Sequence, residues 1–129
     1  MNTEQPKQGL LLIAHGARDP AWARPFEAIA ARIAARAPER VVRIAYLDHL
    51  APNIDAASGA LVREGCKRID VLPMFLGAGG HVQRDVPLAV EALGRRHPQV
   101  RFVTHPTIGE VGEVIDAMAA SVVELSSGP

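Results

Sequence analysis

A chain of 129 residues, 48% hydrophobic and 22% charged, has the length and balance of one folded domain rather than of a disordered polymer. Its 14 Lys and Arg residues equal its 14 Asp and Glu residues, which excludes a strong overall field for nucleic acid or an anionic membrane. We therefore expect a single domain over residues 1–129, with a polar leader at 1–8, a tail at 126–129, and neither a nucleic-acid nor a membrane partner.

The number of cysteines and the character of the first residues indicate the cellular compartment of the protein. The single cysteine, Cys66, has no partner for a disulfide within the chain and is expected to be a small buried core residue. No apolar run approaches the length of a membrane span, and the first residues lack the hydrophobic stretch of a signal peptide. These features predict a cytoplasmic protein.

The first expected strand is Leu10–Ala14, a continuous apolar run that is typical of a strand covered on both faces. A loop over residues 16–20 follows. It leads to a helix that has Pro25 in its first turn and ends at Ala37-Pro38. The apolar side of this helix is expected to comprise Trp22, Phe26, Ile29, Ala30 and Ile33.

The second expected strand is Val41–Leu47, and the charge of Arg43 within it favours a place at an edge of the sheet. Pro52 and Asn53 open the next helix, and Gly65 is expected to cap its C-terminus. The apolar side of that helix is expected to comprise Ile54, Ala57, Leu61 and Val62.

The third expected strand is Ile69–Phe75, with Pro73 near the end of regular pairing because proline lacks a donor for the ladder. A glycine-rich loop follows, after which Asp85 is expected to cap a helix that has Pro87 in its first turn. That helix is expected to end at His97-Pro98 and to bury Val86, Ala89, Val90 and Leu93.

The fourth expected strand is Val100–Thr104, which alternates in polarity as an edge strand does. A last helix follows it. The apolar residues that recur at helical spacing there are Val111, Val114, Ile115, Met118 and Val122.

Strand and helix alternate four times, which predicts an α/β fold with a parallel four-stranded sheet and helices on both faces. If the two most apolar strands are central, the strand order is 2-1-3-4, as in a flavodoxin-like three-layer sandwich. A crevice is then expected where the first and third strands end. His15, after the first strand, and His81, in the loop after the third, both belong to it.

Two convergent imidazoles suit Co, Ni, Fe or Zn better than Mg or Ca, which prefer oxygen ligands. Two protein ligands also leave coordination positions free for a substrate. Asp48, beside His49, offers a carboxylate ligand or a base. The alternatives are that His15 is a strand-end histidine satisfied by backbone and that Asp48 is a turn carboxylate.

Other polar residues point to weaker interpretations. We expect structural roles for His97, beside a helix-ending proline, and for His105, at the end of an edge strand. The glycines after the third strand match neither a Walker motif nor G-x-G-x-x-G, so nucleotide binding is disfavoured. Phosphoryl transfer through a histidine is a minor option, because no arginine precedes His15.

Several motifs together carry a family resemblance between Leu10 and Met118. They are Ala14-His15-Gly16-Ala17-Arg18-Asp19-Pro20; Tyr46-Leu47-Asp48 followed by Pro52; Leu72-Pro73-Met74-Phe75-Leu76 with Gly80-His81; Asp85-Val86-Pro87; and Ile108-Gly109. On these motifs the chain resembles the short sirohydrochlorin chelatases, the CbiX-like family that inserts cobalt, and in relatives iron or nickel, into a tetrapyrrole.

The resemblance implies a single chelatase-like lobe, half of a bilobal class II chelatase, that works as a homodimer. It implies that His15 and His81 hold the incoming metal, and that Asp48 stands where the family usually has Glu. A divalent metal, Co²⁺ first and Fe²⁺ or Ni²⁺ as options, is then a substrate, with no permanently bound cofactor. The pathway implied is that of cobalamin or a related tetrapyrrole.

The mechanism inferred from the resemblance assigns His15, His81 and Asp48 to catalysis, since each can accept a proton from the macrocycle. Gly79 and Gly80 belong to the loop against which a sirohydrochlorin-type tetrapyrrole docks. Arg18 and Arg84 are candidates for its peripheral carboxylates, or else solvated loop charges. A protein that carries metal or tetrapyrrole without catalysis is the alternative function.

Overall fold

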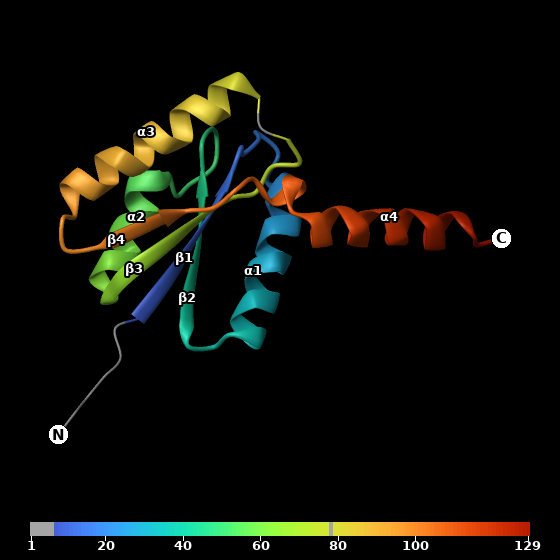
Figure 1. Ribbon diagram of the computed structural model, residues 1–129, viewed down its shortest axis with the longest axis horizontal. Coiled ribbons are helices and arrows are strands. Elements are labelled where there is room, and N and C mark those ends of the chain that lie inside the picture. Colours follow the sequence, from blue (N-terminus) through green and yellow to red (C-terminus); the bar gives the residue numbers. More distant parts are fainter. Residues whose placement is uncertain (1–6, 78) are drawn as a thin grey trace.

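The computed structural model describes residues 7–77 and 79–129, and at His81 the backbone alone. Its centre is a parallel sheet in the order β2-β1-β3-β4, which confirms the predicted topology (Figure 1). The strands are β1 (Lys7–Ala14), β2 (Arg40–Tyr46), β3 (Cys66–Pro73) and β4 (Arg101–Thr104). The two strands with the longest apolar runs, β1 and β3, are central, as a sheet covered on both faces requires.

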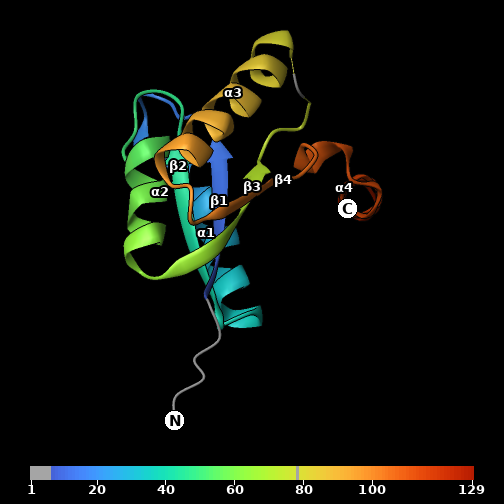
Figure 2. The same ribbon diagram turned by 60° about the vertical axis from the view of Figure 1, so that its left-hand side comes forward.

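The helical segments are the 3₁₀ turns η1 (Pro20–Ala23) and η2 (Ile108–Glu110) and the helices α1 (Arg24–Arg36), α2 (Ile54–Arg63), α3 (Gly80–Arg96) and α4 (Gly112–Ser126). Helix α1 packs on one face of the sheet against β2. Helices α2 and α3 cover the opposite face (Figures 1 and 2). The expected helices on both faces are confirmed, and α4 stands apart from both layers.

The main core lies between the sheet and the α2–α3 layer. Its fully buried members come from β1, β2, α2 and β3 and include Leu11, Ile13, Leu61, Ile69 and Val71. Burying each such side chain contributes about 1.5–3 kcal/mol. Cys66 belongs to this core as a free thiol, as predicted, and burial raises its pKa.

Local signals at the ends of α1 and α2 act as predicted. The side chain of Asn53 accepts a hydrogen bond from the Ala56 amide at 2.8 Å, which caps α2. Gly65 follows α2 with φ +95°, a conformation that glycine adopts without a Cβ penalty. Pro25 lies in the first turn of α1.

Strands β1 and β3 begin earlier than expected, whereas β3 ends at Pro73 rather than Phe75 and β4 begins at Arg101 rather than Val100. Strand β1 begins at Lys7 and β3 at Cys66, three residues before the apolar runs at Leu10 and Ile69. Lys7 and Gln8, assigned to the polar leader, therefore pair in the sheet. Ladder hydrogen bonds use the backbone, so pairing continues past the buried run into polar residues.

The predicted start of α3 at Asp85 is wrong. The helix begins at Gly80, with Gly79 as an extended N-cap, and it includes Pro87 in its interior. The Gln83 amide donates to the Gly79 carbonyl at 3.0 Å, so the helical pattern is established before Asp85 is reached. Pro87 has no amide hydrogen to donate, but α3 continues through it to Arg96.

Two apolar expectations also need correction. Trp22 lies in η1 rather than in α1, and it is 67% exposed instead of facing a core. None of the residues of α4 is buried, so its apolar side has no cover within the described chain. Among residues 7–77 and 79–129, no helix combines the length and apolar character needed to cross a membrane.

Candidate functional site

The candidate site lies at the carboxyl edge of the sheet, where β1 and β3 end beside each other. His15 follows β1 directly, and Met74 and Phe75 follow β3. A cavity of about 630 Å³ opens here. Its lining is largely apolar and consists of His15, Gly16, Ala17, Trp22, Phe26, Tyr46, Met74, Phe75, Leu76 and Gly77. Carboxyl ends of neighbouring parallel strands are the usual place for ligands in such folds.

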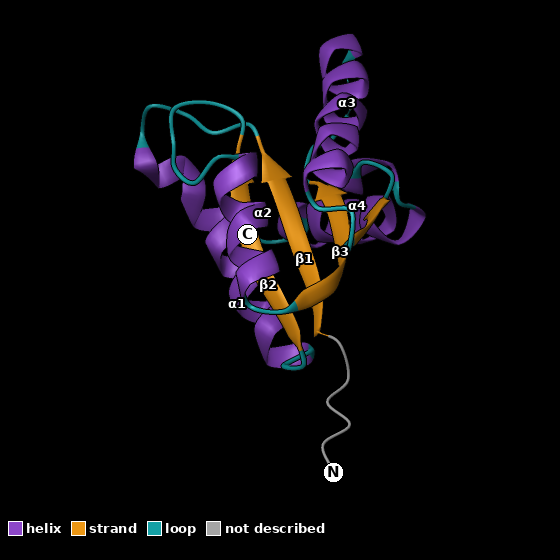
Figure 3. Ribbon diagram, turned by 90° about the vertical axis from the view of Figure 1, so that its left-hand side faces the viewer, coloured by secondary structure: helices purple, strands orange, loops and turns teal. Residues whose placement is uncertain are grey.

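Backbone hydrogen bonds fasten the loop after β1 to the loop after β2. The Leu47 amide donates to the Ala14 carbonyl, and the Asp48 amide donates to the His15 carbonyl, both at 2.9 Å. The loops that these bonds join lie above the strand ends in Figure 3. The position of His15 therefore depends on main-chain atoms of both loops.

Gly16 is required for this fastening. Its φ is +85°, and a Cβ placed there would lie 1.9 Å from the Asp48 carbonyl oxygen. Any side chain would push the two loops apart, so the glycine after His15 has a steric function. The His-Gly pair is thus explained locally by the approach of the second loop.

The imidazole of His15 is exposed and lies against Phe75, with ring centroids 4.4 Å apart and planes inclined by 47°. Within the described residues, neither ring nitrogen has a hydrogen-bond partner. The alternative of a strand-end histidine satisfied by backbone therefore lacks support. The aromatic contact orients the ring while leaving both nitrogens available to a ligand.

Asp48 is exposed at the end of the second loop, and its neighbour His49 has φ +66°. The Asp48 main chain contacts the loop after β1 through its amide and through the carbonyl that Gly16 accommodates. The carboxylate itself makes no hydrogen bond or ion pair with the described residues. Asp48 is not among the residues that line the cavity, and its role as ligand or base stays a prediction.

His81 lies in the first turn of α3, and its side chain is outside the described part of the structure, as is Ala78. The convergence of the His15 and His81 imidazoles stays a prediction. In the described residues, no three His, Cys, Asp or Glu side chains gather in a way that would hold a metal ion.

The other predicted binding residues lie around the site rather than in the cavity wall. Arg18 is exposed in the loop after β1, and Arg84 is exposed on α3. An added Cβ at Gly79 would meet nothing within 4 Å, and at Gly80 it would meet only the Arg84 guanidinium, at 3.8 Å. No close contact therefore requires a glycine at either position.

The sequence analysis missed the apolar wall of the cavity. Trp22, Phe26 and Tyr46 were assigned to secondary structure, but they line the cavity together with Leu76, which is 72% exposed. Burial, with a contribution from Glu27, raises the pKa of the Tyr46 hydroxyl, which keeps it neutral. The signal in the sequence is Trp22, which follows His15 closely in the segment after the first strand and could have been assigned to the cavity lining.

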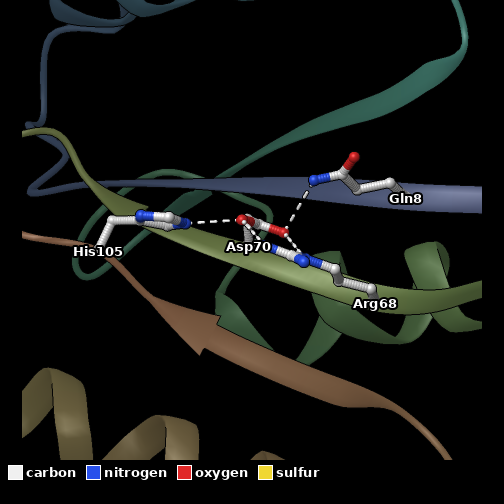
Figure 4. Close-up of polar contacts among 4 residues, drawn as sticks. All are labelled: Gln8, Arg68, Asp70 and His105. Atoms are coloured by element: carbon white, nitrogen blue, oxygen red, sulfur yellow. Dashed lines mark hydrogen bonds and ion pairs between the residues drawn. The ribbon is translucent and has the colours of Figure 1, made fainter.

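A second polar cluster lies on the sheet below the site (Figure 4). Asp70, 5% exposed, accepts hydrogen bonds from Arg68 Nε at 2.8 Å and Gln8 Nε2 at 3.0 Å, and its Oδ2 lies 2.6 Å from His105 Nε2. The bond from Arg68 holds the pKa of the Asp70 carboxyl well below its usual value; burial opposes this, and His105 and Gln8 add to it.

His105 fits its expected structural role, since it is bound to Asp70 and lies outside the lining of this cavity. The His97 amide donates to the Leu93 carbonyl at 2.8 Å at the end of α3, and the role of its imidazole stays a prediction.

Solved structures share this architecture. A protein named for cobalamin (vitamin B12) biosynthesis, CbiX from Marinobacter aquaeolei VT8, matches with a TM-score of 0.79 at 30% identity, over 91% of this chain and 95% of that one. SirB from Bacillus subtilis with Fe³⁺ matches with a TM-score of 0.79 at 27% identity, over 95% of this chain and 48% of that one. The fold is the α/β fold that the CbiX and SirB structures share.

The sequence comparisons make the assignment specific. The profile of the CbiX family matches residues 9–125, and the chain belongs to this family. It is 30% identical over 90 residues to the sirohydrochlorin cobaltochelatase of Methanocaldococcus jannaschii, covering 70% of this chain and 63% of that one. It is 29% identical over 112 residues to the sirohydrochlorin ferrochelatase of Bacillus subtilis, covering 87% and 43%. The chain thus spans about half the length of the curated relatives it matches.

Proposed function

We propose that the protein inserts a divalent metal ion into sirohydrochlorin. The observation that carries the proposal is the unpaired, exposed imidazole of His15 at an apolar cavity, on the fold of a family whose relatives are named sirohydrochlorin cobaltochelatase and ferrochelatase. An apolar wall suits the face of a macrocycle, and an open imidazole suits a metal that must leave again.

Co²⁺ is the proposed metal, with Fe²⁺ and Ni²⁺ as options. Relatives at 30–32% identity are named cobaltochelatases, and one at 29% is named a ferrochelatase. SirB of Bacillus subtilis subspecies spizizenii, with a TM-score of 0.78 at 26% identity over 92% of this chain and 50% of that one, is known in complex with cobalt. The metal is a substrate in this proposal, in the pathway of cobalamin or a related tetrapyrrole.

The proposed catalytic roles fall on His15, His81 and Asp48. The two imidazoles hold the ion loosely, since nitrogen ligands suit Co²⁺, Ni²⁺ and Fe²⁺. Insertion releases two pyrrole protons, and a cation nearby favours that loss. Asp48, fastened beside His15 through its main chain, is the proposed proton acceptor.

The proposed substrate contacts surround the cavity. The macrocycle rests on the apolar wall and on the bare surface at Gly79 and Gly80. Arg18 and Arg84, both exposed, bind its peripheral carboxylates from the surrounding loop and helix.

We also propose that two copies assemble as a homodimer in the cytoplasm. The Bacillus relatives that match are about twice as long as the matched part of this chain, so a second copy supplies an equivalent half. The cytoplasmic assignment is based on the single cysteine, buried here as a free thiol.

The decisive experiment mixes the purified full chain anaerobically with sirohydrochlorin and Co²⁺, Fe²⁺ or Ni²⁺ in turn and follows the absorption spectrum. We expect insertion with at least one metal, and a loss of about 100-fold or more in His15→Ala and His81→Ala. His97→Ala, at the far end of α3, is the matched control and should keep the wild-type rate. Asp48→Ala should insert the metal slowly, whereas Asp48→Glu should retain activity.

Two outcomes would count against the proposal. Folded His15→Ala protein that inserts metal at the wild-type rate would overturn the site. Binding of metal or macrocycle without any accelerated spectral change would instead support the carrier function.

A further inference from the structure

Tyr46 brings a buried hydroxyl without a partner to the wall of the cavity. The residue is 6% exposed and lines the cavity with Trp22 and Phe26. Its hydroxyl makes no hydrogen bond to the described residues. Among the enclosed side-chain oxygens and nitrogens of these residues, Ser58 Oγ alone lacks a partner, so the Tyr46 hydroxyl must reach an opening. A phenol in this position is available to a ligand.

The opening lies on the α1 side of the sheet. Successive side chains of a strand point to opposite faces. Ala45 belongs to the core beside α2 and α3, whereas Tyr46 packs with Ala23 and Phe26 on the other face. Because Phe26 also lines the cavity, the Tyr46 side chain borders it from this face. A second cavity that Tyr46 borders is lined by residues of α2 and α3, on the face from which its side chain points away.

Main-chain contacts hold Tyr46 beside the loop that carries His15. Tyr46 is the register partner of Ala14, the residue before His15, and its amide donates to the Pro52 carbonyl at 2.9 Å. A Cβ added at Gly16 would lie 3.3 Å from the Tyr46 Cβ. The phenol and the imidazole therefore come from adjacent strand ends and line the same cavity, so a ligand that fills it meets both.

The free protein gains nothing from this hydroxyl. Moving a hydroxyl from water to a largely apolar site without a new hydrogen bond is unfavourable, and phenylalanine would fill the same space without that cost. A ligand that completes the missing hydrogen bond offsets the cost. The oxygen of Tyr46 therefore contributes to binding rather than to folding.

The surroundings of the hydroxyl favour a hydrogen-bond donor on the ligand. Glu27 of α1 acts electrostatically on the phenol, so a carboxylate of the ligand would meet like charge there. The peripheral carboxylates of the macrocycle also have Arg18 and Arg84 as proposed partners. Its pyrrole N–H groups are donors, and a phenol oxygen accepts hydrogen bonds from donors of this kind.

We propose that the Tyr46 oxygen accepts a hydrogen bond from a pyrrole N–H group of the metal-free macrocycle, an inference that rests on the proposed function. Insertion releases the pyrrole protons, so the metallated product cannot form this bond. A site that bonds to an N–H group discriminates against the molecule that lacks it. Tyr46 thus makes the cavity prefer the substrate to the product and favours product release.

The first test titrates the full chain with metal-free sirohydrochlorin, with no metal added. Trp22 is the single tryptophan of the chain and lines the cavity, so quenching of its fluorescence reports binding. We expect Tyr46→Phe, which removes only the oxygen, to raise Kd about 3- to 10-fold, as the loss of one hydrogen bond predicts. An unchanged Kd would overturn this inference alone. A wild type that does not bind the macrocycle would overturn the proposed function with it.

The product distinguishes the ring nitrogens from the periphery of the macrocycle. In the same titration with sirohydrochlorin that already contains Co²⁺, the Kd of Tyr46→Phe should match that of the wild type. Equal weakening for substrate and product would mean that Tyr46 binds a peripheral carboxylate, which both molecules carry. That result would overturn the assignment to a pyrrole N–H group.

Ser58→Ala is the matched control, because Ser58 Oγ on α2 is also buried without a partner but lies outside the cavity lining. We expect both variants to unfold at the wild-type temperature or above it, since neither hydroxyl is bonded within the described protein. Tyr46→Phe should weaken binding of the metal-free macrocycle, and Ser58→Ala should not. A lower melting temperature for Tyr46→Phe would give the hydroxyl a structural role and would contradict the proposal.

Discussion

His15 and Asp70 show two opposite uses of a polar side chain in one sheet. Asp70 is buried and accepts from Gln8 and Arg68, with His105 at its other oxygen, so its bonding capacity is used within the fold. The His15 imidazole rests on Phe75 and has no partner for its nitrogens in the described residues. A side chain whose hydrogen bonds are complete stabilises structure, whereas one held only by packing stays available to a ligand.

Replacing Asp70 should make stability less dependent on pH. The pKa of the Asp70 carboxyl is depressed in the folded state, chiefly by Arg68, so its contribution is complete above the unfolded pKa near 3.9 and is lost as the pH falls below it. We expect Asp70→Asn to lower the free energy of unfolding by about 1–3 kcal/mol at neutral pH, with the difference shrinking towards pH 3. Urea denaturation at several pH values measures this.

Asp55→Asn is the control for that experiment. Asp55 pairs with Arg96 at 2.8 Å, but both side chains are more than half exposed. An exposed pair contributes about 0–1 kcal/mol, so this variant should behave nearly as the wild type does. Equal effects of the two substitutions would contradict the role assigned to Asp70.

Trp22 should matter for substrate binding and little for stability. It is 67% exposed and lines the cavity beside His15, where its ring can lie against a flat macrocycle. Loss of an aromatic contact costs about 0.5–1.5 kcal/mol, so Trp22→Ala should raise KM by about 2- to 10-fold with kcat nearly unchanged. Leu88→Ala removes an apolar side chain on α3 that is 60% exposed, similar to Trp22, but lies outside the cavity lining. This variant should leave KM unchanged. Steady-state metal insertion tests both.

At the scale of the element, the site is a junction of two loops held by backbone. The hydrogen bonds between residues 14–15 and 47–48 join the ends of β1 and β2, and Gly16 permits their approach. After β3, Gly77 lines the cavity, and neither Gly77 nor the nearby Gly79 has such a steric demand. An added Cβ is therefore forbidden at Gly16 and tolerated at Gly77 and Gly79.

Gly16→Ala should destabilise the protein by about 2 kcal/mol or more, because it adds both a disfavoured φ and a contact of 1.9 Å with the Asp48 carbonyl. Gly77→Ala, where an added Cβ meets nothing within 4 Å, should stay within about 0.5 kcal/mol of the wild type. Thermal unfolding of the two variants compares them directly. A Gly16→Ala protein as stable as Gly77→Ala would show that the loops are not fastened as described.

Elements with a strong local signal were predictable. The apolar runs of β1 and β3 and the charges of β2 and β4 gave the strand order, and Asn53 and Gly65 marked the limits of α2. The start of α3 was not predictable in this way. Consecutive glycines suggested a loop through His81, yet Gly79 serves as an extended cap and the helix begins at once.

The candidate site was predictable only in part. A histidine and a glycine after a buried strand indicated His15 because strand ends of parallel sheets meet at one edge. The contacts of Trp22 and Phe75 with the cavity depend on how η1 and the loop after β3 fold back over the strand ends, which no periodicity encodes. The joint action of His15 and His81 stays a prediction.

At the scale of the whole molecule, the chain has two helices on one face of the sheet and one on the other, with a fourth helix outside. The proposed homodimer should have a stability that depends on protein concentration. No residue of α4 is buried, although its sequence is rich in Val and also contains Ile and Met.

We expect the melting temperature of the wild type to rise by about 5 °C when its concentration rises a hundredfold, because association is linked to folding. Differential scanning calorimetry at several protein concentrations provides the measurement. A wild-type midpoint that does not change with concentration would contradict the proposed homodimer.

The bonds that place His15 use main-chain atoms of residues 47 and 48 and not the Asp48 carboxylate, which has a consequence for how such a centre can change. Geometry and acidity are separable at this position: Glu, whose carboxylate is one methylene farther from the backbone, alters reach and proton affinity without changing those bonds. Homologous chains can therefore adjust the acid to a different ion or macrocycle while inheriting the same imidazole placement unaltered.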